Sequence, residues 1–287
     1  MATHQKKHIL LTGGSGFIGR NIVEQLASKY AVFAPSCEEL DLLDELSVAR
    51  FFKDRHFDAI IHAAHIGIYK AEEEFNGIAE KNILMFFNIV QHLTPFQKMI
   101  FLGSGAEYDK RRNITLATED EFGKHIPKDS YGFAKYVCSK YLETKGNIIN
   151  LRCFGIYGKY EQHARFISSA IISALGHKPI NIRQNAYFDY LYIDDLIKII
   201  DYFLSHKPKY TSYNVASGTR VDLITLSHIV KNVIGYNEKI LIEKSGLSKE
   251  YTANIDRLKQ EIALSPTSFE KGISMLVNYY KNSLPKD

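Results

Sequence analysis

The sequence contains no tryptophan and only three cysteines among its 287 residues. The cysteines are Cys37, Cys138 and Cys153, an odd number with no CxxC pair, so a disulfide framework is not expected. We interpret all three as small buried residues of a protein from a reducing compartment. Composition also excludes a disordered chain, because 45% of the residues are apolar.

Neither charge sign dominates, and no apolar run is long. The 36 basic residues exceed the 32 acidic ones by four and are scattered, so nothing predicts nucleic-acid binding. No stretch approaches the ~20 apolar residues of a membrane span. The beginning of the chain has only three consecutive apolar residues before its glycines, too few for a signal peptide. We therefore expect a cytoplasmic protein with neither nucleic acid nor membrane as a partner, whose mildly positive charge suits an anionic small substrate.

Short apolar runs alternate with amphipathic stretches through the first half of the chain. Strands separated by helices of this length form βαβ units, so the pattern predicts an α/β fold with a doubly wound parallel sheet. The expected strands are 8–12, 31–35, 58–64, 98–104 and 147–154, and the expected helices are 17–29, 46–55, 80–93 and 128–146.

The pattern loosens from Gly155 onward, with loops expected at 158–163 and 176–189. A second, smaller unit interleaved with the first accounts for this change. We predict a first domain of residues 1–154, to which 190–215 return, and a second domain of residues 155–189 and 216–287.

A glycine-rich turn, TGGSGFIGR (12–20), follows the first strand and opens the first helix. A dinucleotide site needs such a turn for three reasons: a tight bend, close approach of backbone N–H groups to a pyrophosphate, and close packing of helix on strand. The alternative is a purely structural turn. We predict cofactor contacts from this segment at Gly13, Gly16, Phe17, Ile18, Gly19 and Arg20.

Two further motifs follow in order: FLGSGAEY (101–108), which holds Ser104, and YGFAK (131–135). With the glycine turn, with IIHAA (60–64) and with Asn82, they resemble the extended branch of the short-chain dehydrogenase/reductase superfamily, which contains nucleotide-sugar epimerases, dehydratases and reductases. LRCFGIYG (151–158), YIDDL (192–196) and NVASG (214–218) extend the resemblance. It implies a Rossmann-type sheet, a nicotinamide dinucleotide, a nucleotide-sugar substrate and a C-terminal substrate domain.

The expected catalytic residues are Ser104, Tyr131 and Lys135. Tyr131 and Lys135 lie four positions apart, on one face of a helix. A tyrosine with its usual pKa of ~10 needs a nearby cation to act as a base, and Lys135 supplies that charge. The resemblance implies that Lys135 also binds the nicotinamide ribose and that Ser104 binds the sugar oxygen. Tyr131 then transfers the proton while the nicotinamide transfers hydride.

Neighbouring positions separate the possible reactions. Similar 4,6-dehydratases carry Asp and Glu directly after the Ser or Thr, where this chain has Gly105 and Ala106; Glu107 is one place out of register. Similar reductases that also epimerise C3 and C5 carry Cys at the place of Ala106 and a His that His163 matches. Net reduction of a 4-keto nucleotide sugar is therefore favoured, partly because the chain is short for the family. The alternatives are a 4-epimerase with tightly bound NAD, and a non-catalytic nucleotide-binding regulator, against which the presence of Tyr131 and Lys135 argues.

The end of the second strand favours NADP(H), with NAD(H) still possible. A free ribose 2′-OH is usually held by an acid at this point, and AVFAPS (31–36) ends without one. Ser36 and Arg20 are candidates for contacts with a 2′-phosphate. Glu38 and Glu39 weaken this preference, because a small shift of the strand end places a carboxylate against the ribose.

Other cofactor and substrate contacts follow from the resemblance. Cofactor contacts are expected at Asp41, Leu42, Ala63, Ala64, His65 and Asn82, and substrate contacts at Ser104, Ala106, His163, Arg165 and Arg183. The two arginines are proposed because Phe188 stands where relatives have a phosphate-binding Arg; their alternative is a solvated charge. Gly155 replaces a usual Asn. His62 is expected in the core, and no metal site is expected from His62 and His65 or from His4 and His8.

Apolar faces on the helical segments 83–90 and 136–142 have two possible uses. Related enzymes bury such faces in a four-helix bundle with a second subunit, so we expect a homodimer. The alternative is that these residues fill the core under the sheet.

Overall fold

A six-stranded parallel sheet forms the centre of the molecule. The computed structural model describes residues 6–67, 77–95, 97–237 and 239–283. The strands are β1 (His8–Thr12), β2 (Ala31–Phe33), β3 (Ala59–His62), β4 (Lys98–Ser104), β6 (Ile148–Cys153) and β10 (Ser212–Val215). They lie in the order β10-β6-β4-β3-β1-β2, and every neighbouring pair is parallel.

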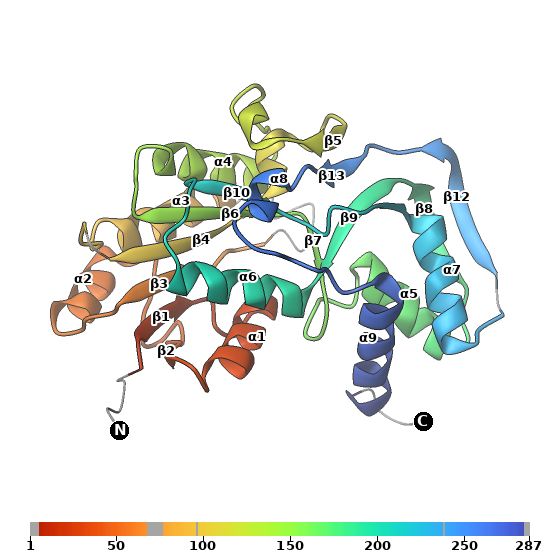
Figure 1. Cartoon of the computed structure of the whole chain (residues 1–287), viewed down its shortest axis with the longest axis horizontal. Coiled ribbons are helices and arrows are strands. Elements are labelled where there is room, and N and C mark those ends of the chain that lie inside the picture. Colours follow the sequence, from red (N-terminus) through yellow and green to blue (C-terminus); the bar gives the residue numbers. More distant parts are fainter. Residues whose placement is uncertain (1–5, 68–76, 96, 238, 284–287) are drawn as a thin grey trace.

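Helices cover both faces of this sheet (Figure 1). They are α1 (Phe17–Leu26) and α6 (Ile193–Ser205) on one face, and α2 (Glu45–Lys53), α3 (Ile78–Val90) and α4 (Ser130–Leu142) on the other. Successive strand residues point to opposite faces, so Ile9 and Leu11 pack in a core with Ile22 of α1. Leu10 packs in a second core with Phe86 of α3. The predicted doubly wound sheet of the Rossmann type is confirmed.

The strand order creates a crevice beside β1. After β1 the chain places β2 on one side of it and β3 on the other. The connections therefore diverge at the carboxyl ends of β1 and β3, and open α/β sheets bind ligands at such a switch point. The glycine-rich turn leaves β1 here, and the segment 63–65 leaves β3.

The second half of the chain builds smaller sheets beside the first (Figure 1). One has the order β11-β9-β13-β5, with β7 also paired to β9, and the other pairs β12 with β8. The strands are β5 (Ile114–Ala117), β7 (Gly155–Tyr157), β8 (Ile180–Asn185), β9 (Tyr187–Tyr192), β11 (Arg220–Asp222), β12 (Ile240–Leu247) and β13 (Tyr251–Ala253). The helices here are α5 (Phe166–Leu175), α7 (Leu223–Ile234), α8 (Asp256–Lys259) and α9 (Phe269–Ser283).

The boundaries between the two units remain a prediction, although several elements bear on them. Within 190–215, α6 packs on the six-stranded sheet and β10 joins it. Within 1–154, however, β5 pairs with β13 and so belongs to the second sheet. Each unit therefore contains at least one segment from the part of the sequence that forms most of the other unit.

Two local expectations are wrong. The range 176–189, expected as a loop, contains β8 and the first half of β9; Ile180 and Ile182 are buried on alternate positions of β8. Cys37 is exposed, because it lies in the turn after β2, whereas Cys138 and Cys153 are buried as expected.

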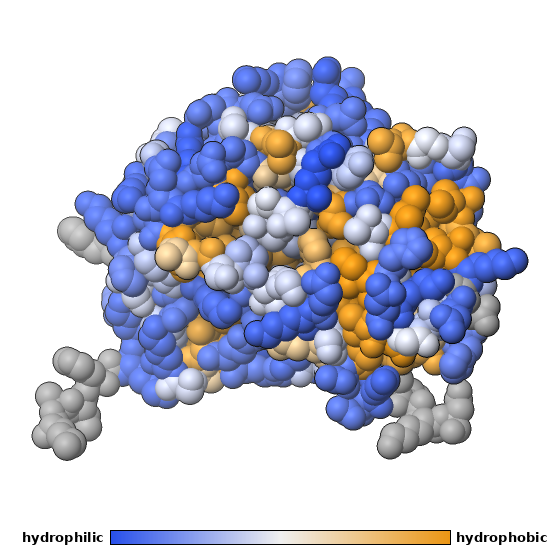
Figure 2. Space-filling model, turned by 45° about the vertical axis from the view of Figure 1, so that its right-hand side comes forward, coloured by the Kyte–Doolittle hydropathy of each residue, from blue (hydrophilic) through white to orange (hydrophobic). Residues whose placement is uncertain are grey.

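The side of the molecule formed by β8, β12, α5, α7 and α9 is rich in apolar residues (Figure 2). Strand β12 contributes exposed Leu241, Ile242 and Leu247 to it. Among the described residues, no helix combines the length and the apolar character that crossing a membrane requires.

Candidate active site

The glycine-rich turn accepts no side chain at two of its positions. Gly13 has a φ of +74°, and a Cβ there would lie 2.6 Å from the backbone N of Ala64 on the neighbouring segment. A Cβ at Gly19 would lie 2.1 Å from the carbonyl oxygen of Gly13. The Gly16 N–H closes the turn on the same carbonyl at 3.1 Å. The glycines thus bring β1, α1 and the end of β3 together.

The N-terminus of α1 opens from this turn. Gly16 is its N-cap, brings no side chain to cap the first turn, and is exposed. Backbone N–H groups at an uncapped helix start are ready donors for an anion. Phe17 and Ile18 belong to this first turn. The cradle therefore fits the diphosphate of a nicotinamide dinucleotide, with Gly16, Phe17 and Ile18 as the residues that would hold it.

A tight turn between Ser36 and Glu39 follows β2. The Ser36 N–H donates to Glu39 Oε2 at 2.8 Å, and the Glu39 N–H donates to Ser36 Oγ at 3.3 Å. Arg20, expected to reach this turn, instead lays its guanidinium 3.7 Å above the ring centre of Tyr160. Asp41 accepts a hydrogen bond from the Leu43 N–H, in the segment that leads to α2.

Buried side chains fix the end of β3 and the segment that follows it. Thr12 Oγ1 lies 2.9 Å from Nδ1 of His62, and the Asn82 side chain bonds both the N–H and the carbonyl of Ile66. Burial lowers the pKa of His62 to about 3, so this core histidine is neutral. Asn82, expected to contact the cofactor, thus shapes the segment that contains Ala63, Ala64 and His65. Leu42 lies in the core, and its carbonyl accepts from Asn88.

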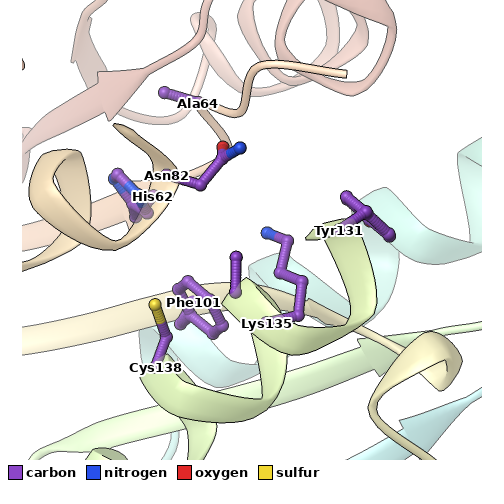
Figure 3. Close-up of a pocket in the computed structure, with 8 residues that line it drawn as sticks. His62, Ala64, Asn82, Phe101, Tyr131, Lys135 and Cys138 are labelled. Carbon is purple, nitrogen blue, oxygen red and sulfur yellow. The ribbon is translucent and has the colours of Figure 1, made fainter. Parts of the chain in front are cut away.

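Tyr131 and Lys135 line one pocket, and Ser104 lies beside Tyr131. Asp129 caps α4 by accepting from the Gly132 N–H at 2.8 Å, which places Tyr131 in the first turn and Lys135 in the next. Ser104 ends β4 and lies close enough to Tyr131 to lower the pKa of its phenol. Figure 3 shows Tyr131 and Lys135 projecting from the same helix, across from Ala64 and Asn82. The residues that line the pocket are His62, Ala64, Asn82, Phe101, Tyr131, Ala134, Lys135 and Cys138.

Burial shifts the pKa of both members of this pair toward the neutral form. It raises the pKa of Tyr131 to about 12, and the nearby Ser104 side chain only partly offsets this. Burial lowers the pKa of Lys135, whose amino group donates to the Leu102 carbonyl at 2.6 Å and lies 6.0 Å from the Tyr131 ring centre. The buried phenol of Tyr131 is therefore favoured in its protonated form, as a proton donor requires.

A buried ion pair fixes the backbone at Ser104. Glu107 and Arg152 are both almost fully buried, with Arg152 Nε 2.7 Å from Glu107 Oε2. Glu107 Oε1 accepts from the Ser104 N–H at 2.8 Å, and Ser104 Oγ accepts from the Ala106 N–H at 3.1 Å. This capping box fixes the backbone at the end of β4. Ala106 itself is 1% exposed, which does not suit a substrate contact.

The other three residues expected to contact the substrate, Arg165, His163 and Arg183, lie in different parts of the second unit. Arg165 precedes α5, pairs with Glu161 at 2.8 Å and is close enough for its charge to act on Tyr131. His163 instead stacks edge-on against Tyr280 of α9, with 5.5 Å between ring centres. Arg183 is an exposed residue of β8. Of the three, Arg165 is the one that the fold brings toward the catalytic residues.

Sequence reasoning missed Tyr251. Its hydroxyl lies 2.6 Å from the place of a Cβ on Gly105, next to Ser104, and its ring contacts those of Phe154 and Phe188. No motif surrounds Tyr251 in the sequence, and the proximity depends on the pairing of β13 with β5 and β9. Phe188, at the position of the missing phosphate-binding Arg, belongs to this aromatic cluster.

Comparison with known proteins gives a family and a set of relatives. The model of the NAD dependent epimerase/dehydratase family matches residues 9–216. GDP-L-colitose synthase of Yersinia pseudotuberculosis is 26% identical, over 97% of this chain and 99% of that protein. A putative UDP-glucose 4-epimerase of Methanocaldococcus jannaschii is 27% identical, over 96% of this chain and 99% of that protein.

Solved structures share the fold. A GDP-mannoheptose C4 reductase from Campylobacter jejuni with NADP bound superposes with a TM-score of 0.83 at 19% identity, covering 96% of this chain and 98% of that one. Reductases and epimerases thus both stand among the similar proteins, and the chemistry has to be argued from the site.

Proposed function

The chain belongs to the NAD dependent epimerase/dehydratase family, and we propose that within it the protein reduces the 4-keto group of a nucleotide sugar, with NADP(H) as cofactor. The observation that carries this proposal is the placement of the Tyr131 phenol beside Ser104, with no acid at positions 105 and 106. Reduction of a ketone needs one proton donor at the oxygen. Elimination of water needs a further acid and base. Glu107 does not supply them, because its carboxylate pairs with Arg152 and accepts from the Ser104 N–H.

The residues of the pocket then have distinct roles. The hydroxyls of Ser104 and Tyr131 bind the keto oxygen, and Tyr131 donates its proton to that oxygen as it becomes an alkoxide. A bound reduced nicotinamide dinucleotide supplies the hydride. Lys135 stabilises the phenolate that remains, because a buried cation favours the charged form of a nearby acid. Arg165 is the cation best placed to attract the anionic diphosphate of the substrate.

The preference for NADP(H) rests on the end of β2. Pro35 and Ser36 follow the strand, and the carboxylate of Glu39 accepts a hydrogen bond from the Ser36 N–H. A carboxylate used in this way is not aimed at a ribose hydroxyl. The Campylobacter jejuni reductase, whose fold this chain shares, has NADP bound.

A 4-epimerase with tightly bound NAD is the second candidate. Ser104, Tyr131 and Lys135 serve an oxidation followed by a reduction as well as a reduction alone. The Glu39 carboxylate, which accepts from the Ser36 N–H in the turn after β2, favours this candidate, because a negative charge there repels a 2′-phosphate.

One experiment separates these functions. Purified protein is incubated with NADPH or NADH and a panel of 4-keto nucleotide sugars, while the loss of absorbance and the identity of the product are followed. Reduction predicts one equivalent of NADPH consumed per product formed. NAD that co-purifies, with interconversion of hydroxyl epimers in the absence of added cofactor, supports the epimerase. Cofactor binding without turnover of any sugar indicates a nucleotide-binding regulator.

We also propose that two copies of the chain associate through α3 and α4. These helices pack against each other, and Leu84 of α3 and Phe133 of α4 remain 44% and 40% exposed. A dimer would bury both in a four-helix bundle. Light scattering after gel filtration should give twice the chain mass for the wild type and the monomer mass for Leu84→Glu; a wild-type monomer contradicts the proposal.

A further inference from the structure

A basic triplet, Lys110, Arg111 and Arg112, follows shortly after the end of β4, behind the short 3-10 helix η2 (Gly105–Tyr108). The preceding Asp109 has a φ of +72°, a left-handed conformation that Asp adopts more readily than most residues. Its buried carboxylate accepts from Nε and a terminal nitrogen of Arg111, both at 2.7 Å, and Arg112 Nε lies 3.8 Å away. The two arginines thus hold this turn, with Lys110 between them.

Lys110 turns toward α4 and Tyr131. Its Nζ lies 4.0 Å from Oδ1 of Asp129, the N-cap of α4, and 5.6 Å from the centre of the Tyr131 ring. The corresponding distance for Lys135 is 6.0 Å, and that ammonium donates to the Leu102 carbonyl. Tyr131 therefore has two lysine ammonium groups near its ring, one buried in the pocket and the other 47% exposed.

A positive charge beside a tyrosine stabilises the phenolate more than the phenol, because only the phenolate carries a charge. At the separation of Lys110 and Tyr131, with water screening a half-exposed ammonium, the attraction is worth about half a unit to one unit of the pKa of the phenol. The Asp129 carboxylate, on the other side of the ammonium, offsets part of this attraction. The sign of the effect is that of a group that helps Tyr131 to release a proton.

We propose that Lys110 is a positioning residue that acts through Tyr131, by stabilising the phenolate that forms when Tyr131 gives its proton to the substrate oxygen. The role rests on the proposed function only in that Tyr131 is the proton donor, and it applies to reduction and epimerisation alike. Lys110 supplies from the solvent side the charge that Lys135 supplies from inside the pocket.

Titration of residue 131 tests this role without turnover. A trifluorinated tyrosine placed there ionises while the protein is folded and before the other tyrosines do, so the absorbance of its phenolate reports this one group. Lys110→Met should raise its pKa by about half a unit to one unit, and Lys110→Arg, which keeps the charge, should leave it within about 0.2 unit. With Lys110 present, added salt should raise the same pKa, because salt screens a half-exposed charge.

Lys140→Met is the matched control. Lys140 lies on α4, is 55% exposed, pairs with Glu143 at 2.6 Å and has its Nζ 5.7 Å from the ring centre of Phe122. Its loss removes a similar ammonium from a different ring, so the pKa of residue 131 should stay within about 0.2 unit. Other ionisable groups act on residue 131 and are the same in every variant: His65, Glu107, Lys135, Cys153, Arg165 and Tyr251.

Turnover connects the charge to the reaction. With the natural tyrosine at position 131, Lys110→Met should slow the single-turnover step about threefold to tenfold, with the Kd of the cofactor within twofold of the wild type. In the Tyr131→Phe background the same substitution should have no further effect on the rate. Lys110→Arg should restore most of the rate.

Four results would overturn the proposal: a pKa shift below about 0.2 unit in Lys110→Met, an equal shift in Lys140→Met, the expected shift with no loss of rate in an active enzyme, or a loss of rate that persists in the Tyr131→Phe background. The kinetics are run on whichever reaction the wild type catalyses, so a failed reductase assignment leaves the test intact. For a wild type without measurable turnover, the titration decides alone.

Discussion

The buried pair of Glu107 and Arg152 offers a test of how the end of β4 is supported. Their side chains are 0% and 2% exposed, and the carboxylate also accepts from the Ser104 N–H. In Arg152→Leu the carboxylate loses its counter-ion while it stays buried. Removing one partner of a buried ion pair costs about 3–5 kcal/mol of the free energy of unfolding. Urea unfolding at pH 7 should show a loss of this size.

The exposed pair of Arg220 and Glu250 provides the matched control. It has comparable geometry, with distances of 2.8 and 2.9 Å, but Arg220 is 43% exposed. Because water screens such a pair, Arg220→Leu should cost less than about 1 kcal/mol.

Equal losses in Arg152→Leu and Arg220→Leu would refute the reasoning. So would a loss in Arg152→Leu smaller than about 1 kcal/mol, the value expected for an exposed pair.

The remaining predictions concern other parts of the chain. Gly19→Ala should abolish NADPH binding in calorimetry and lower Tm, because its Cβ would lie 2.1 Å from the Gly13 carbonyl oxygen. An unchanged affinity for NADPH contradicts the proposal that the glycine-rich turn binds the cofactor. Burial raises the pKa of Glu161 to about 7, so its contribution to stability is present below about pH 4.5 and is lost as the pH rises through 7. Glu161→Gln should flatten this part of the stability profile, by up to about 3 kcal/mol, and an unchanged profile contradicts the assignment. Lys135→Ala should weaken cofactor binding and lower kcat, whereas Ser104→Ala should lower kcat alone; equal cofactor affinity in both variants would contradict the role of the lysine.

Much of the fold could be predicted from the sequence because its signals are local. Apolar runs and helical spacing identify the strands and helices around β1, and the glycine turn and the YxxxK motif lie within single junctions. Ser104, Tyr131 and Lys135 therefore converge as the motifs predict.

The remainder depends on contacts between distant segments. The pairing of β13 brings Tyr251 to the end of β4, beside Gly105. Arg20 packs on Tyr160, which lies in a loop distant from it in the sequence. The raised pKa of Tyr131 follows from burial, which no spacing of residues specifies. The position of β8 was missed because two buried isoleucines among polar residues are a weak strand signal.

Replacing Tyr131 by Phe tests the central claim most directly. Single-turnover oxidation of NADPH by Tyr131→Phe, with a 4-keto nucleotide sugar that the wild type reduces, should be slower by about 10²–10⁴-fold, the usual contribution of a general acid. The Kd of NADPH should stay within twofold, since the lost hydroxyl acts on the substrate oxygen. Tyr136→Phe, on the same helix and in contact with Phe122, should match the wild type. A Tyr131→Phe enzyme that keeps half of the wild-type rate would contradict the account.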